Sequence, residues 1–183
     1  MLKTIVILIV VVVVAILAWA SMQPDTLHVE RTVTINAPAV EIFPLINDLH
    51  QWQSWSPWEK KDPAMKRTYS GPPSGKGAGY EWEGNSQVGS GRMEVTESTA
   101  PSKITMQLHF IKPFEGHDVG EFTLKPNGNS TTVTWSMTGP NRYLGKVMSI
   151  FVNMDKMIGN DFQDGLNNLK AIAERSSRAV TKR

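Results

Sequence analysis

The first segment of the chain constrains its structure most strongly, because such a segment has no stable place in contact with water. Residues 4–20 read TIVILIVVVVVAILAWA and carry no charge. As a helix, this run would be about 25 Å long at ~1.5 Å per residue, which is near the lower limit for crossing a bilayer. Its aliphatic side chains together would favour insertion by roughly 4–7 kcal/mol. We therefore predict that residues 1–22 are a transmembrane anchor, with the apolar run extending from Thr4 to Ala20.

A secretory signal peptide is the alternative interpretation of this segment. Lys3 would be its charged start, and Ala18-Trp19-Ala20 has the A-x-A pattern of a cleavage site. The anchor is favoured because the apolar run is at or beyond the usual length of a signal-peptide core. Lys3 before the run, and Asp25 and Glu30 after it, leave the positive end in the cytoplasm. The sequence thus predicts a single-pass protein of a bacterial inner membrane with its domain in the periplasm, or a secreted domain after cleavage near Ala20.

Composition limits the chemistry that the rest of the chain can perform. The 183 residues suffice for one domain of ordinary size and a short appendage. The chain has no cysteine, so it offers neither a disulfide nor a thiolate ligand or nucleophile. Its net charge is only +2, without the one-sided basic stripe of a nucleic-acid-binding protein, so no nucleic acid partner is expected. The basic residues at 176–183 are interpreted as a solvated tail.

Apolar residues alternate with polar ones at the start of the domain and again up to about Met137, and two short helices are predicted between these regions, one beginning at Asn36-Ala37-Pro38 and one that carries Leu49, Trp52 and Trp55. The segment from Leu27 to Ile35 has this pattern, and so do several segments after residue 79, such as 104–110 and 133–137. A period of two is typical of strands with one buried face. Turn signals separate these segments, and Asn127-Gly128 is the strongest hairpin signal among them. The pattern predicts an antiparallel sheet with one wet and one apolar face.

A single long helix is predicted from about Leu144 to Glu174. Apolar residues recur there at helical spacing and form one stripe, which contains Val147, Phe151, Met154, Ile158, Phe162, Leu166, Leu169 and Ala173. A strongly curved sheet wrapped around this helix would hide both apolar faces. The predicted fold class is therefore α+β. Where the curvature prevents complete closure, a cavity is expected between sheet and helix.

Four segments carry a resemblance to a known superfamily. They are INAPAVEIF at 35–43, WQSWSPW at 52–58, NMDKMIG at 153–159 and DFQDGL at 161–166. They resemble the START-like SRPBCC superfamily, and in particular its polyketide cyclase/dehydrase and lipid-transport-like members. The resemblance covers residues 27–175, the predicted domain, and implies a helix-grip fold. It does not single out one activity, because the superfamily includes lipid carriers, cyclases, hormone receptors and chaperone activators. The predicted anchor argues against a freely diffusing cytosolic cyclase.

The residues predicted to line a ligand pocket are mostly apolar side chains that would face the space between sheet and helix. They are Trp52, Trp55, Trp58, Tyr80, Trp82, Met93, Met106, Leu108, Phe110, Phe122, Trp135, Met137, Phe151, Met154, Ile158 and Phe162. Tryptophans can form the mouth of such a pocket, and methionines adapt to flexible guests. Ordinary core packing is the alternative for both groups, and it is the favoured interpretation for Trp82 and Trp135.

No catalytic set is recognised in the sequence. Along the chain, none of the four histidines has a second histidine at metal-ligand spacing, so no metal site is predicted; they are His28, His50, His109 and His117. No cofactor is expected either. We therefore predict a membrane-anchored binding module for a hydrophobic small molecule or lipid. The alternatives are a cyclase- or hydrolase-type enzyme that uses the same pocket, and a ligand-free interaction or co-chaperone-like protein.

Overall fold

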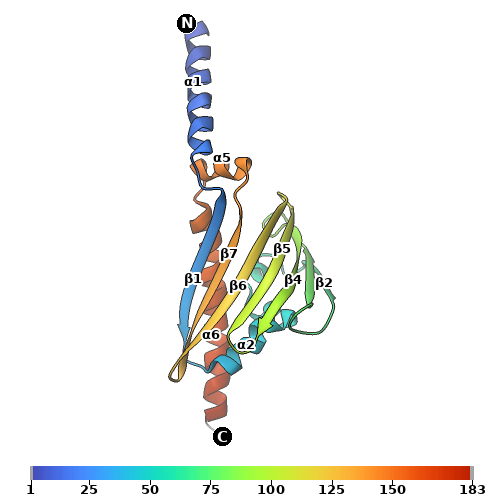
Figure 1. Ribbon diagram of the computed structural model, residues 1–183. Coiled ribbons are helices and arrows are strands. Elements are labelled where there is room, and N and C mark those ends of the chain that lie inside the picture. The colour runs from blue at the N-terminus through green and yellow to red at the C-terminus, as the bar shows by residue number, and fades with distance from the viewer. Residues whose placement is uncertain (1, 182–183) are drawn as a thin grey trace.

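The computed structural model of the protein describes residues 2–181, and the side chains of residues 144, 151 and 179–181 lie outside this description. One apolar helix projects from a domain in which a seven-stranded sheet packs against a long C-terminal helix (Figure 1). The helices are α1 (Leu2–Ser21), α2 (Ala39–Asn47), the 3-10 turn η1 (Leu49–Gln51), α3 (Trp52–Trp55), α4 (Pro57–Lys61), α5 (Tyr143–Phe151) and α6 (Met154–Thr181). The strands are β1 (Thr26–Ile35), β2 (Lys66–Ser70), β3 (Gly79–Glu83), β4 (Ser90–Thr99), β5 (Lys103–Lys112), β6 (Gly116–Asn127) and β7 (Ser130–Pro140).

The sheet is antiparallel throughout, with strand order β1-β7-β6-β5-β4-β3-β2. From β2 to β7 each strand pairs with the next one along the chain, while β1 joins the far edge through β7. The predicted hairpin at Asn127-Gly128 connects β6 and β7, and Gly128 has a φ of 59°, which glycine adopts without strain. The predicted α+β helix-grip fold is confirmed.

The core lies between one face of the sheet and the helices. On β7, Val133, Trp135 and Met137 are buried and alternate with less buried hydroxyl residues, as the period-two pattern predicts. On α6, Phe162, Leu166 and Leu169 are buried at helical spacing. The short helices α2 to α4 cover the rest of this face, with buried residues such as Ile42, Ile46 and Trp55.

The prediction of one continuous helix from Leu144 to Glu174 is wrong. The helix stops at α5, Val152 is extended, and α6 starts afresh at Met154 and continues to Thr181, into the predicted tail. The side chain of Asn153 accepts a hydrogen bond of 2.8 Å from the backbone N–H of Lys156, which is the geometry of a helix N-cap. Val147 therefore belongs to α5, which lies across the base of α1 (Figure 1), and not to the stripe of α6.

α1 is long and apolar enough to cross a membrane, a property that an anchor and a signal sequence share. Most of its side chains are exposed. At its C-terminal end it packs against α5, where the Tyr143 hydroxyl donates a hydrogen bond of 3.2 Å to the carbonyl oxygen of Leu17.

Candidate functional site

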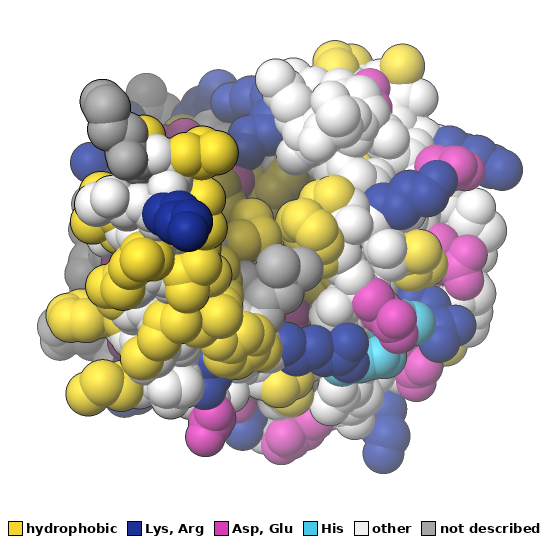
Figure 2. Space-filling model, turned by 90° about the horizontal axis from the view of Figure 1, so that it is seen from above, with side chains coloured by type: hydrophobic (Ala, Val, Ile, Leu, Met, Phe, Trp, Pro, Cys, Tyr) yellow, Lys and Arg dark blue, Asp and Glu magenta, His cyan; other side chains and the backbone are white. Residues whose placement is uncertain are grey.

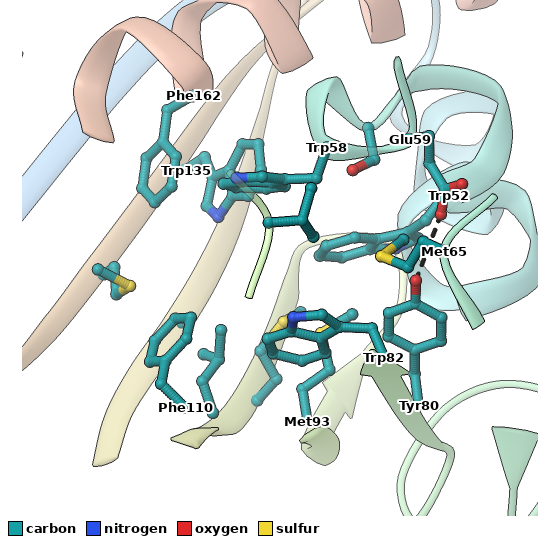
Figure 3. A pocket seen from close by; sticks show the side chains of 16 residues that line it. Trp52, Trp58, Glu59, Met65, Tyr80, Trp82, Met93, Phe110, Trp135 and Phe162 are labelled. Carbon is teal, nitrogen blue, oxygen red and sulfur yellow. Dashed lines mark hydrogen bonds between the residues drawn. The ribbon is translucent and has the colours of Figure 1, made fainter. Parts of the chain in front are cut away.

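A cavity lies between the sheet and the short helices α3 and α4, with one side chain of α6 in its wall (Figure 3). The volume of this cavity is about 110 Å³. Its wall is formed by Trp52, Ser56, Trp58, Glu59, Met65, Tyr80, Trp82, Val88, Met93, Met106, Leu108, Phe110, Gly120, Trp135, Met137 and Phe162. The wall is mostly aromatic and methionine side chains, with a few polar groups on one side.

Most of the residues predicted for the pocket lie in this wall, but five do not. Trp55 and Phe122 are completely buried in the core beside it. Ile158 is half-buried and packs against the core, and Met154 is half-buried in the first turn of α6. Phe151 lies in α5, and its side chain is outside the described residues.

Three aromatic rings from three different elements form one end of the cavity. Trp135 of β7 and Phe162 of α6 are stacked, with ring centroids 4.1 Å apart and planes 3° apart. Trp58 of α4 stands edge-on to Trp135 at 5.7 Å. Gly165 permits this packing, because a Cβ atom there would lie 2.8 Å from the Trp135 ring. This end of the cavity is therefore held by the contact between helix and sheet.

The indole N–H groups of Trp52 and Trp55 fix the short helices in place. Trp52 donates to the carbonyl oxygen of Ile46, and Trp55 to that of Leu45, both at 2.9 Å. These carbonyl groups belong to the last turn of α2, where the helix itself supplies no partners. The three tryptophans of residues 52–58 therefore differ in position: Trp55 packs in the core, whereas Trp52 and Trp58 line the cavity.

A partly buried polar cluster closes the side of the cavity next to β2 and β3. Arg67 donates from Nε to Glu59 at 2.9 Å and also from Nη2 to the same carboxylate, while its Nη1 donates to the carbonyl oxygen of Met65 at 2.5 Å. The Tyr80 hydroxyl donates to Glu59 at 3.3 Å (Figure 3). Burial, and then the charge of Glu59, raise the pKa of the Tyr80 phenol, so it stays a neutral donor at physiological pH.

The sequence analysis missed Ser56, Glu59, Met65, Val88 and Gly120 as wall residues. Gly120 gave a usable signal, because a glycine on the apolar face of a strand often marks a close approach. A Cβ atom there would lie 2.9 Å from Leu108 and 3.0 Å from Met106. Glu59 gave no such signal, because its partner Arg67 belongs to a separate strand.

The outer face of the β5–β6 hairpin brings together His109, Glu115 and His117. The two histidines pair directly across the strands, and their rings stack with centroids 4.1 Å apart. One carboxylate oxygen of Glu115 lies 3.7 Å from Nε2 of His109 and 3.6 Å from Nε2 of His117. Spacing along the chain did not reveal this cluster, because the hairpin creates it.

Together, the curved sheet, the gripping α6 and the aromatic wall define a helix-grip domain built around an apolar cavity. Residues 26–174 match the family described as polyketide cyclase / dehydrase and lipid transport, and the chain belongs to this family. The resemblance to SRPBCC proteins is thereby confirmed. No curated protein matches the chain in sequence.

Solved structures with the same fold are distant in sequence. A protein from Nitrosospira multiformis is 17% identical with a TM-score of 0.60, over 83% of this chain and 99% of that one. The Aha1 dimer from Colwellia psychrerythraea is 15% identical with a TM-score of 0.58, over 81% and 96%. DynU16, a putative protein of the dynemicin biosynthetic locus, is 16% identical with a TM-score of 0.58, over 85% of this chain and 49% of that one. At these identities the likeness shows the fold alone.

Proposed function

We propose that the protein is a membrane-anchored binding module that holds a hydrophobic small molecule, or part of a lipid, in the cavity between the sheet and α6. The observation that carries the proposal is a cavity whose wall is almost wholly aromatic, aliphatic and methionine side chains. Transfer of apolar surface from water into such a wall contributes about 25 cal/mol per Å². A ring-sized group of ~150 Å² would therefore gain about 4 kcal/mol.

The size of the cavity favours a guest group rather than a whole lipid. An engineered apolar cavity of about 150 Å³ holds one benzene molecule. The volume of about 110 Å³ is on that scale, so it suits a ring or a short stretch of an acyl chain. Met93, Met106 and Met137 line the cavity, and their flexible side chains would let it adapt to larger guests.

α1 supports the membrane part of the proposal through its length and apolarity. We place the domain on the periplasmic side of a bacterial inner membrane, because Lys3 precedes the apolar run while Asp25 and Glu30 follow it. Carbonate extraction of membranes and N-terminal sequencing of the mature chain test whether α1 is retained as a membrane anchor. Release into the supernatant, with a new N-terminus near Ala20, would show a signal peptide instead.

The binding proposal is tested by the thermal stability of full-length, delipidated protein in amphipol. A guest at ~100 times its Kd stabilises by about 2.7 kcal/mol, which is roughly 5–10 °C in Tm for a domain of this size. Phospholipid or isoprenoid extract should produce a shift of this order.

Two tryptophan variants make this experiment specific. Leu108→Trp narrows the half-buried wall of the cavity and should abolish the shift. Val119→Trp introduces the same side chain at an exposed position of the neighbouring strand and should keep the shift. Equal shifts in both variants, or none in the wild type, would refute binding in this cavity.

A cyclase- or hydrolase-type enzyme is the second candidate, because Glu59 and Tyr80 place two titratable groups in the wall. An enzyme should convert its guest, and Tyr80→Phe or Glu59→Gln should stop the conversion. Mass spectrometry of the bound guest before and after incubation distinguishes the two functions. A carrier returns the guest with unchanged mass in wild type and in both variants.

A further inference from the structure

The mouth of the cavity lies at the end of the domain from which α1 emerges. Two partly buried residues of the wall, Leu108 and Phe110, lie near the C-terminal end of β5. Phe110 pairs with Gly116 at the start of β6, and Leu27 at the start of β1 pairs with Gly139 near the end of β7. These strand ends therefore lie together at one end of the sheet. It is the end at which the chain enters the sheet from α1. Figure 2, seen from this end, shows a hollow beside α1 with hydrophobic side chains at its floor.

α5 is fastened to this end of the domain. Lys146 is buried and donates a hydrogen bond of 2.5 Å to Asp25, in the linker that follows α1. Asn141 donates from its backbone to the carbonyl oxygen of Asp25 at 2.7 Å and from its side chain to that of Pro24 at 3.0 Å. With the Tyr143 contact to α1, these bonds hold α5 across the base of α1 (Figure 1).

Large apolar side chains are exposed on the same end. Ile111 and Phe114, at the tip of the β5–β6 hairpin, are 52% and 55% exposed, and Tyr143 of α5 is 50% exposed. If α1 crosses the bilayer, its end at Ser21 lies in the headgroup region, Tyr143 lies beside it, and the tip of the β5–β6 hairpin points toward the same side (Figure 1). Tyrosine is favoured there because its ring is apolar and its hydroxyl is polar, and the exposed apolar side chains of Ile111 and Phe114 would gain from leaving water.

We propose that the cavity opens onto the bilayer that holds α1, with α5 and the tip of the β5–β6 hairpin seated among the headgroups. This inference rests on the proposed anchor. A lipid could then move one part of itself from the bilayer into the cavity without crossing water. The small volume of the cavity agrees with this, because the rest of the lipid would stay in the membrane.

The absence of cysteine from the sequence permits a direct test with single-cysteine variants of the full-length chain. Each variant carries an environment-sensitive NBD probe and is reconstituted in phosphatidylcholine–phosphatidylglycerol liposomes, with or without spin-labelled lipid. Phe114→Cys reports on the hairpin tip. Val40→Cys is the matched control, an apolar residue that is 65% exposed on α2 at the opposite end of the domain. Leu8→Cys reports on insertion of α1.

Spin-labelled lipid should quench the probes at positions 8 and 114 several-fold more than the probe at position 40. Quenching at position 8 with equal, weak quenching at 114 and 40 would overturn the inference and leave the anchor intact. An unquenched probe at position 8 would overturn the anchor itself, and with it the inference. Lipid-induced thermal shifts report on the binding cavity separately.

The cluster of His109, Glu115 and His117 carries a second, independent inference. In a tetrahedral zinc site with bonds of ~2.0–2.1 Å, ligand atoms lie about 3.4 Å apart. The Glu115 oxygen already lies 3.6–3.7 Å from both histidine nitrogens, and the ligand atoms all lie within 4.8 Å of one another. We infer that this cluster binds a divalent transition metal such as Zn²⁺, with its fourth position open to water.

Calorimetric titration of Zn²⁺ into untagged, chelator-treated full-length protein tests the metal site. One saturable site should appear in the wild type and disappear in His117→Ala. His28→Ala is the matched control, because His28 also lies near a carboxylate, that of Glu30 at 3.8 Å, but gains no third ligand from the described residues. Equal losses in the two variants, or no saturable binding in the wild type, would overturn the inference.

Discussion

Replacement of Arg67 by methionine should destabilise the protein far more than loss of an ordinary surface ion pair. The Arg67 and Glu59 side chains are only 19% and 9% exposed, and the guanidinium donates twice to the carboxylate. Arg67→Met would leave the Glu59 carboxyl group beside Trp52 and Met65 without its partner. Removal of one partner of a buried pair costs about 3–5 kcal/mol, and the remaining exposure of Arg67 favours the lower end. About 3 kcal/mol corresponds to a fall in Tm of roughly 6–12 °C.

The assay is guanidinium unfolding of full-length protein in amphipol, followed by tryptophan fluorescence, since most tryptophans lie at or near the cavity. Lys61→Met is the matched control, because Lys61 pairs with Asp161 at 2.6 Å but the side chains are 35% and 20% exposed. That control should lose under ~1 kcal/mol. The double variant Glu59→Gln/Arg67→Met should recover part of the loss, because it leaves no unpaired charge. If Arg67→Met loses no more than Lys61→Met, the cluster does not stabilise the cavity wall as argued.

Two further predictions concern the sheet. Burial raises the pKa of Asp118, which lies against Gly139, so stability should fall as pH rises from about 4 through that raised pKa and stay lower above it. Asp118→Asn should therefore raise Tm at pH 7 but not below pH 3, and a gain that does not depend on pH would contradict this cause. Gly91→Val should lower the free energy of unfolding by about 1–3 kcal/mol and change the near-ultraviolet circular dichroism of Trp82. The reason is that a Cβ atom at this position would lie 2.5 Å from the Trp82 ring and 2.7 Å from the carbonyl oxygen of His109. Gly116→Val, where the nearest atom lies 3.7 Å away, is the control and should leave both nearly unchanged.

The sheet could be predicted from the sequence because a period of two fixes which face each side chain takes. Val133, Trp135 and Met137 had to share one face whatever the exact register, and turn residues such as Asn127-Gly128 marked where the strands ended. The break before α6 was missed for the opposite reason. Apolar residues keep their helical spacing from Val147 through Ile158, across the position where α5 ends and α6 begins. The spacing therefore gave no reason to interpret Asn153 as a helix cap.

The division between cavity wall and solid core could not be predicted in this way. Phe122 and Trp135 face the same side of the sheet, yet only Trp135 reaches the cavity, because the distance between sheet and helices decides which rings meet. The Glu59–Arg67 pair and the His109–His117 pair depend on the paths of a loop and a hairpin turn. Such pairs join residues that have no periodic relation along the chain, so the sequence pattern carried no signal for them.

The electrostatics of the wall limit what a guest in this cavity can be. Glu59 is neutralised by Arg67, and the Tyr80 phenol stays neutral, so the wall presents no net charge to a guest. A charged group that entered would lose its hydration without finding an opposite charge, which costs several kcal/mol. An apolar group loses nothing by entering, and one hydroxyl group on it could still donate a hydrogen bond to the Tyr80 oxygen, whose own hydrogen is donated to Glu59. The proposed module should therefore select its guest by shape and apolar area, and a charged headgroup should stay at the mouth, where the proposed bilayer contact would leave it among other headgroups.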